Sequence, residues 1–428
     1  MGRLAWTLAA LWVLGCDGPA CGPPELGAGG DAAVTHDDLA SSLDLTSMIP
    51  PGEDLATAPP GPDLSSTVGA PDLAPAGLRM PSFAPAVTYA AHDTPSAVVI
   101  GEFSGDGKLD VVAANSHSSD ISVLVGNGAG ALAAPKNLTV AAEPASLLAV
   151  ELTGDTKTDL VIGYGDNNAN SSTTQLSLLP SNGDTTFGAR QDFMVTQLAQ
   201  CPHLAKGDVN GDGRLDVAVL CNTEIAVLLQ GAGGGLLAPT YAYGASNGQA
   251  GMALGDFHHS GRADLLAGSH PTPPMDDNAW LLTSTGGGNF SSAVDTGGPG
   301  YRAIEVGDFD GDGKLDFVGN ITSKLNFVRG HGDGTFDAPV PLPVAGRMSI
   351  AVVDLNGDGK LDLAVAGLDS QVLTLLVGKG DGTFPQSINY LAGVAPFSIA
   401  AGDLNGDGKP DLVIADLIAV QVLLNTTP

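Results

Sequence analysis

A nine-residue pattern recurs seven times between residues 102 and 411, and this recurrence restricts the possible fold more than any other feature. One full copy is Asp308-Phe-Asp310-Gly-Asp312-Gly-Lys-Leu-Asp316. The copies begin roughly every 50 residues, a spacing typical of a propeller, a solenoid or another array of similar units.

Four copies carry oxygen-bearing side chains at positions 1, 3, 5 and 9 and Gly at position 6. These side chains are Asp208, Asn210, Asp212 and Asp216; Asp308, Asp310, Asp312 and Asp316; Asp354, Asn356, Asp358 and Asp362; and Asp403, Asn405, Asp407 and Asp411. Three weaker copies contain Glu102, Ser104, Asp106 and Asp110; Glu151, Thr153, Asp155 and Asp159; and Asp256, His258, Ser260 and Asp264. In the second of these, Thr156 replaces the Gly of position 6.

Short apolar, β-branched runs flank each copy. In one repeat they are Leu361–Val365, Val372–Val377 and Ile388–Tyr390, with a Gly-rich turn before the last. Four such runs per repeat, without a helical period, predict one four-stranded antiparallel sheet per repeat. The fold class predicted for residues 82–428 is therefore all-β, a seven-bladed β-propeller.

The two ends of this region predict how the ring closes. The last repeat stops at Asn425, after its third strand, whereas Ser82–Tyr89 precedes the first repeat centre and resembles the missing fourth strand. We expect the N-terminal strand to complete the last blade, which removes an open sheet edge.

The repeat centres are the predicted metal sites. Several oxygen ligands in one tight loop, with Gly permitting a positive φ, suit Ca²⁺, whereas Zn²⁺ sites use Cys and His. An EF-hand is excluded because its twelfth position would be Val219, inside a strand. The alternative is metal-free turns capped by Asp and Asn; three or four oxygen ligands per loop make that unfavourable for the full copies, and in the copy at Asp308 four carboxylates would repel one another. For the copies at Glu151 and Asp256 both interpretations stay open.

These loops, with the Gly-Asp-Gly-Thr-Phe turns that follow several of them, resemble FG-GAP/VCBS repeats of integrin α-subunit propellers and certain lectins. The resemblance implies calcium loops between the first and second strands at one face and ligand binding at the other. The chain has no integrin-type inserted domain or leg domains, so integrin ligand chemistry is not carried over.

The resemblance directs attention to the loops Gly165–Thr174 and Gly268–Asn278 and to a rim of candidate ligand residues. These are His203, Tyr301, Arg302, Arg347, Phe397 and Trp280. Arg and aromatic side chains can hold an acidic sugar or a protein loop. Packing of the loop bases is an equally good interpretation.

The N-terminal 80 residues differ from the repeats. Residues 1–16 carry one base, an apolar run and Val13-Leu14-Gly15-Cys16, which resembles a bacterial lipobox with lipidation at Cys16. An ordinary signal peptide is the alternative. Residues 17–80 are rich in Pro, Gly and Asp, and we expect a disordered tether. The run is too short to span a bilayer, so membrane attachment would be through the lipid alone.

Two other cysteines flank the third loop. Cys201 and Cys221 lie on strands expected to pair, and a disulfide between them is predicted, with two buried thiols as the alternative. Cys21 is left over in the tether.

Charge and motifs limit the function. The formal net charge of −30 argues against nucleic-acid binding. Gly244-Ala-Ser246-Asn-Gly248 fits a nucleophile elbow but lacks the following helix, and no catalytic residue is predicted. We expect an exported, monomeric, calcium-binding propeller that recognises a glycan or a protein. A propeller-scaffold enzyme, such as a polysaccharide lyase or phosphodiesterase, and a purely structural surface module are the alternatives.

Overall fold

A computed structural model of the chain describes residues 78–141, 143–165, 176–195, 203–221, 225–243, 251–268, 278–291, 293–321, 324–344 and 348–428. Over these ranges the regular elements are thirty β-strands and no α-helix. The search for a helix able to cross a bilayer found none in the same ranges. The predicted signal peptide, Cys16 and nearly all of the tether lie outside the described residues.

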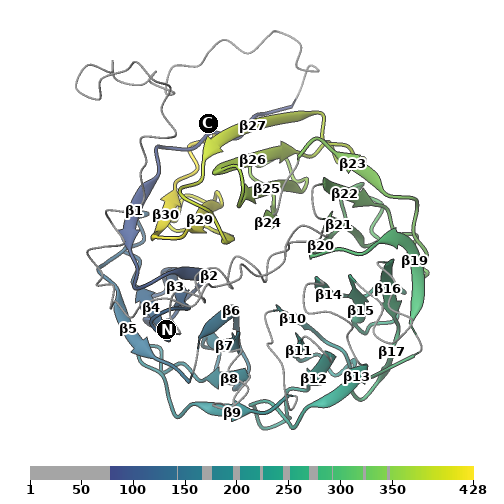
Figure 1. The fold of residues 1–428 in the computed structure, drawn as a ribbon, viewed down its shortest axis with the longest axis horizontal. Coiled ribbons are helices and arrows are strands. Elements are labelled where there is room, and N and C mark those ends of the chain that lie inside the picture. The colour runs from purple at the N-terminus through teal and green to yellow at the C-terminus, as the bar shows by residue number, and fades with distance from the viewer. Residues whose placement is uncertain are drawn as a thin grey trace, which may run out of the picture. The chain divides into compact units, whose positions relative to one another are not determined.

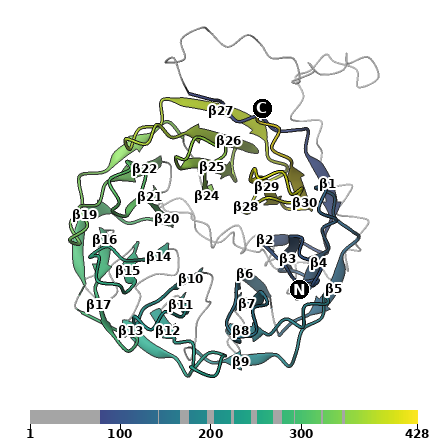
Figure 2. The same ribbon diagram turned by 180° about the vertical axis from the view of Figure 1, so that it is seen from behind.

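Twenty-eight of the strands form seven antiparallel four-stranded sheets arranged as a ring (Figures 1 and 2). We number the sheets as blades and give the strands from the inner to the outer edge. Blade 1 is β2 (Pro95–Gly101), β3 (Asp110–Asn115), β4 (Asp120–Leu124) and β5 (Lys136–Thr139); blade 2 is β6 (Pro144–Val150), β7 (Asp159–Tyr164), β8 (Leu176–Leu179) and β9 (Gln191–Phe193). Blade 3 is β10 (His203–Gly207), β11 (Asp216–Leu220), β12 (Ile225–Leu228) and β13 (Thr240–Tyr243); blade 4 is β14 (Met252–Gly255), β15 (Asp264–Ala267), β16 (Asn278–Leu282) and β19 (Val294–Pro299).

The remaining blades repeat this order. Blade 5 is β20 (Ala303–Gly307), β21 (Asp316–Ile321), β22 (Lys324–Val328) and β23 (Val340–Leu342); blade 6 is β24 (Met348–Val353), β25 (Asp362–Gly367), β26 (Val372–Val377) and β27 (Gln386–Leu391). Blade 7 is β28 (Ser398–Gly402), β29 (Asp411–Ala415), β30 (Ala419–Leu423) and β1 (Val87–Ala90). The hairpin of β17 (Ser284–Gly286) and β18 (Asn289–Phe290) is added to blade 4. The predicted seven-bladed all-β fold is confirmed.

The core lies between the blades rather than inside one of them. Each of the seven apolar clusters is built from two neighbouring blades. The second strand of a blade therefore has neighbours on both faces: every residue of β3 is buried, and every residue of β5, at the outer edge, is exposed. Continuous apolar runs such as Val111–Ala114 meet this demand, because both faces of the sheet are covered.

The last blade is completed by the N-terminal strand, as predicted. β1 pairs with β30 in an antiparallel register that joins Val87 to Val422 and Ala90 to Ala419. Before β1, Phe83 forms an isolated bridge with Asn425. Blades 7 and 1 then share a cluster that contains Val98 and Val420, so the ring closes with the same kind of core as its other interfaces.

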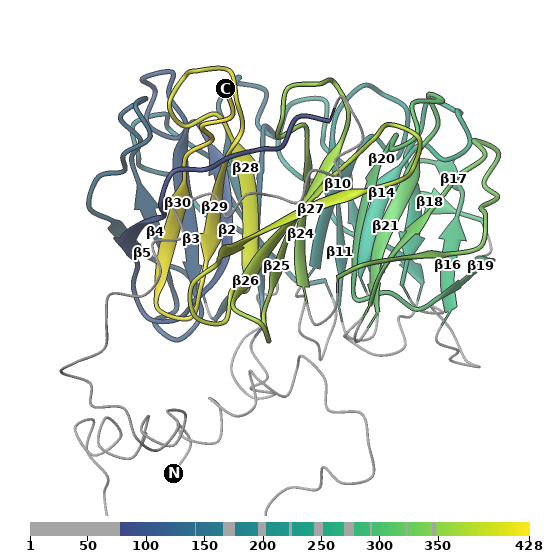
Figure 3. The ribbon, with the colours of Figure 1, turned by 90° about the horizontal axis from the view of Figure 1, so that it is seen from above.

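The ring has two different faces (Figure 3). In each blade the nine-residue loop connects the first and second strands, and the antiparallel order brings the turn after the third strand to the same face. The turns between second and third strands lie at the opposite face. We call these the loop face and the opposite face.

Candidate metal centres and the opposite face

The Asp at position 9 is buried in every blade and holds its loop together. In blade 6 the Asp362 carboxylate accepts a hydrogen bond from the Leu355 N–H at 2.9 Å and another from the Gly378 N–H at 2.8 Å. The first donor is position 2 of the loop, and the second follows the third strand. The same two bonds occur in the other six blades, at Asp110, Asp159, Asp216, Asp264, Asp316 and Asp411.

The Asp at position 1 shapes the turn. The two Asp354 carboxylate oxygens accept from the Gly357 N–H at 2.7 Å and the Gly359 N–H at 2.8 Å. Both glycines have positive φ, 75° and 80°, a region that favours glycine. The full loops of blades 3, 5 and 7 repeat this geometry at Asp208, Asp308 and Asp403.

Position 2 joins each loop to the next blade. Its carbonyl oxygen accepts a hydrogen bond from the neighbouring blade, for example from the Gly382 N–H to Phe309 at 3.1 Å. Equivalent bonds reach Phe103, Leu152, Val209, Phe257, Leu355 and Leu404. The sequence pattern did not reveal this role, because position 2 is only an apolar residue in it.

Burial and repulsion together make the carboxylates of the full loops a candidate cation site. Burial, together with repulsion from the carboxylates of Asp358 and Asp354, raises the pKa of Asp362 to about 7. Burial raises the pKa of Asp316 to about 6 in the same way. A divalent cation with oxygen ligands would relieve this repulsion, so the donor set fits Ca²⁺ in charge and chemistry.

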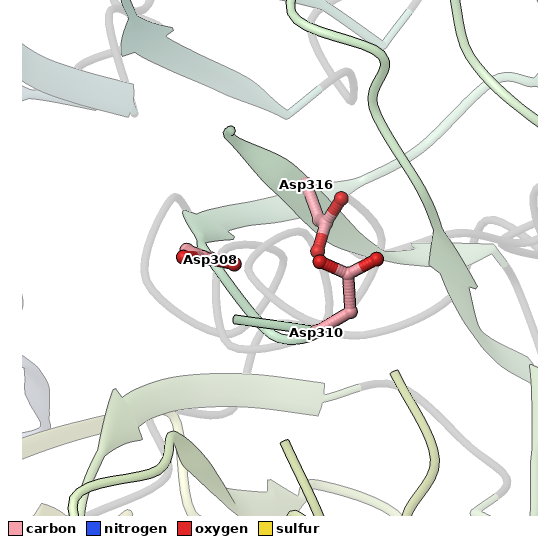
Figure 4. A group of neighbouring side chains, drawn as sticks. All are labelled: Asp308, Asp310 and Asp316. Atoms are coloured by element: carbon pink, nitrogen blue, oxygen red, sulfur yellow. The ribbon is translucent and has the colours of Figure 1, made fainter. Parts of the chain in front are cut away.

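Among the residues that the structure describes, the closest grouping of carboxylates belongs to blade 5. Asp308, Asp310 and Asp316 each offer an oxygen, and these oxygens lie within 4.8 Å of one another (Figure 4). They occupy positions 1, 3 and 9 of one loop, three of the four positions predicted to share an ion. Asp312, at position 5, is paired with Lys314 at 3.3 Å and with Arg329 at 3.1 Å, and Arg329 also pairs with Asp310.

The weaker loops depart from this geometry. In blade 4 the His258 Nδ1 lies 2.8 Å from a carboxylate oxygen of Asp264, so position 3 presents an imidazole where other loops present oxygen. In blade 2, Thr156 has φ 69°, the conformation that Gly adopts elsewhere. In blade 1, Glu102 accepts from the Ser104 and Asp106 N–H groups and thus replaces the shorter Asp as a turn cap.

The predicted rim on the opposite face is only partly exposed. Tyr301 is 1% exposed and stacks edge to face on Phe317, so its assignment to a ligand rim was wrong; it is a core residue. His203, Arg302, Phe397 and Trp280 are half-buried, and burial lowers the pKa of His203 to about 4. Arg347 and most of the two long loops, Gly165–Thr174 and Gly268–Asn278, lie outside the described residues, as does Gly244–Gly248.

Cys221 is disulfide-bonded. Its expected partner Cys201 lies outside the described residues, so the pairing itself stays a prediction.

A cavity of about 270 Å³ opens between blades 5 and 6 toward the opposite face. Its polar lining includes Thr374 of β26 and Ser387 and Asn389 of β27, with Thr374 and Asn389 directly paired across the two strands. Val344 and Val372 contribute apolar walls. Sequence reasoning missed this site, because its residues are small polar side chains on outer strands that match no motif.

The comparisons with known proteins agree with this architecture. The profile of the FG-GAP-like repeat matches residues 103–162, 151–219, 208–267, 261–319, 308–365 and 354–414. A search of curated proteins finds no match. Among solved structures, a lectin of Agrocybe aegerita that recognises non-reducing terminal N-acetylglucosamine is similar, with 19% identity, 76% of this chain and 86% of that chain covered, and a TM-score of 0.52.

A second similar structure is that of BBS1N in complex with ARL6DN, with 11% identity, 81% of this chain and 97% of that chain covered, and a TM-score of 0.54. At these identities both likenesses concern the fold alone. The repeat matches together span most of the described ring and extend from one loop to the next. The chain therefore belongs to the family of FG-GAP-like repeat proteins.

Proposed function

We propose that the chain is an exported, calcium-binding recognition module whose propeller binds a glycan or a protein. The proposed calcium binding rests on the four full loops. In each of them a buried carboxylate with a raised pKa lies near further carboxylates of the same loop. The ion would supply the positive charge that these groups lack.

The ligands proposed for each ion are the side-chain oxygens of positions 1, 3, 5 and 9, with the carbonyl of position 7. Because position 2 of every loop also bonds the next blade, an ordered loop stabilises the blade interface. Calcium is thus proposed to stiffen the ring rather than to take part in a reaction. The loops of blades 1, 2 and 4 offer poorer donor sets, and we expect weaker binding there.

A saccharide is the ligand class that the cavity between blades 5 and 6 supports. Among the described residues, the side chains of Thr374, Ser387 and Asn389 have no hydrogen-bond partner, so they are available to sugar hydroxyls. Valine walls suit the apolar face of a pyranose ring. The fold shared with a glycan-recognising lectin supports the same class, whereas the fold shared with a protein in a complex leaves a protein ligand as the other outcome.

Export and anchoring rest on the N-terminal sequence alone. The apolar run and Cys16 favour a lipid-anchored protein on a bacterial membrane. Substitution of Cys16 by Ser should release the protein from the membrane fraction. Retention of the variant in that fraction would argue against the anchor.

The test combines calorimetry and a glycan array. Chelated protein titrated with Ca²⁺ should bind several ions, and an array run with and without Ca²⁺ should reveal the saccharide. T374V and N389A should then weaken the array signal at least tenfold, whereas T139V, on the exposed outer strand of blade 1, should not. Absence of heat on Ca²⁺ titration removes the calcium proposal, and a blank array with a positive protein pull-down favours the protein ligand.

A further inference from the structure

Blade 5 has a basic side chain inside its loop. Arg329 directly follows β22, and its Nε lies 2.5 Å from a carboxylate oxygen of Asp310. Its Nη2 lies 3.1 Å from a carboxylate oxygen of Asp312. One guanidinium therefore bridges positions 3 and 5 of the loop, two of the proposed calcium ligands.

This arrangement is particular to blade 5. The next residue, Gly330, donates its N–H to Asp316, which fixes the position of Arg329 relative to the loop. The residues at the same place in the other blades are uncharged: Val125, Pro180, Leu229, Thr283, Val377 and Leu424. Every loop has a Lys or Arg at position 7, so Arg329 is an additional base.

Blade 5 also has an additional acid. Position 3 of its loop is Asp310, whereas the full loops of blades 3, 6 and 7 have Asn210, Asn356 and Asn405. The extra carboxylate and the extra guanidinium are thus found together and in contact. With Arg329 counted, the loop has the same net charge as its Asn-containing counterparts.

In the ion pair of Asp310 and Arg329, the Asp310 side chain is nearly buried and the Arg329 side chain is partly exposed. The Asp310 side chain is 7% exposed and that of Arg329 is 45% exposed. A carboxylate removed from water in this way needs a nearby cation, which the guanidinium provides. A Ca²⁺ ion at positions 1, 3, 5 and 9 would use the same two carboxylates, those of Asp310 and Asp312.

We propose that Arg329 is an internal counter-cation of the blade 5 loop, which keeps this loop ordered without metal and which Ca²⁺ must displace in order to bind. The proposal rests on the calcium binding proposed for the full loops. Blade 5 then loads at a higher free Ca²⁺ concentration than blades 3, 6 and 7. Part of the ring stays rigid when calcium is scarce.

The test is R329V in the full-length chain, since Val is the residue of blade 6 at this place. In chelator the variant should melt about 2–4 °C below wild type, because Asp310 and Asp312 lose the guanidinium that lies between them. Native mass spectrometry should count bound Ca²⁺ across a series of free concentrations. The variant should load its fourth strong site at a free concentration about five- to tenfold lower than wild type.

Two control variants distinguish a specific role of Arg329 from a general effect of removing an arginine. R190V removes an exposed ion pair with Asp192 outside the loops and should leave the calcium count unchanged. D310N/R329V recreates the blade 6 combination and should restore the wild-type melting temperature in chelator. Wild-type melting of R329V in chelator, or an unchanged loading curve, overturns the role of Arg329. If the wild-type protein binds no Ca²⁺, both the proposed calcium binding and the competition between Arg329 and Ca²⁺ are wrong. The melting temperatures in chelator still test whether Arg329 stabilises the metal-free loop.

Discussion

The amide of Gly130 in blade 1 donates a hydrogen bond to the carbonyl of Leu404 in blade 7, with 3.2 Å between nitrogen and oxygen. The N–H of the same residue, Leu404, donates a hydrogen bond to the buried Asp411 carboxylate at 2.9 Å. The loop of the last blade is thus bonded to its own position 9 and to the first blade at once. Closure of the ring therefore uses the same contact that joins the other blades, so order in a loop and order at an interface are linked.

Removal of residues 82–90 should open the last blade. The deletion removes β1 from the edge of β30 and the bond from the Ser82 N–H to the Thr427 hydroxyl at 3.0 Å. We expect the melting temperature to fall by at least about 5 °C, since the backbone bonds between β1 and β30 are lost and β30 becomes an open edge. Differential scanning calorimetry checks this. Deletion of residues 51–70 in the predicted tether is the control, and equal melting of both deletions would contradict the role of β1.

Positions 5 and 9 should respond differently to loss of charge. D362N replaces an oxygen that accepts a buried backbone N–H by an NH₂ group, so it should lower the unfolding free energy by about 2–4 kcal/mol with or without Ca²⁺. D358N keeps the oxygen that accepts the Lys360 N–H. It should be harmless in chelator and destabilising only relative to calcium-saturated wild type. Urea denaturation under both conditions measures this, and a calcium-independent loss for D358N would contradict its metal role.

The repeat predicted the fold well because strand lengths, turns and loops are all local in sequence. The approximate place of the closing strand also followed, since Ser82–Tyr89 supplies the run that the last repeat lacks. The partners of position 9 did not follow. Gly378 is far from Leu355 along the chain, and only the folded sheet brings both N–H groups to Asp362.

The opposite face was harder to predict for a related reason. Tyr301 and Arg302 are neighbours at the entry of β20, and the sequence does not say which side chain turns inward. The structure buries Tyr301 against Phe317, while Arg302 stays half-buried. Similarly, Arg329 belongs to no motif in the sequence, and only the fold brings it against Asp310.

Thr156 should be a removable source of strain. Its φ of 69° is in the left-handed region, where the other six blades have Gly at position 6. A non-Gly residue there costs about 1–2 kcal/mol, partly offset by the greater unfolded-state entropy of Gly. T156G should therefore raise the unfolding free energy by about 0.5–1 kcal/mol. The reciprocal G213T in blade 3, where φ is 81°, should be destabilising; stabilisation by both changes would contradict the backbone explanation.

Glu305 should make stability depend on pH. It lies half-buried on the inner strand β20, where burial raises its pKa to about 7, and among the described residues no side chain donates a hydrogen bond to it. A carboxyl with a folded-state pKa above its unfolded value of about 4.3 stabilises the fold while it is protonated. That contribution is complete below about pH 4 and is lost as pH rises through about 7.

E305Q should remove this dependence. At pH 4 the variant and wild type should have nearly equal unfolding free energies, because both side chains are neutral in the folded state. By pH 8 the variant should be more stable by on the order of 2 kcal/mol, a value discounted for partial exposure. Urea denaturation in chelator at several pH values measures the difference, and chelation keeps the loop carboxylates equivalent in both proteins. A difference that is constant between pH 4 and pH 8 would show that Glu305 has the same pKa in the folded and unfolded states, and that burial on β20 does not raise it.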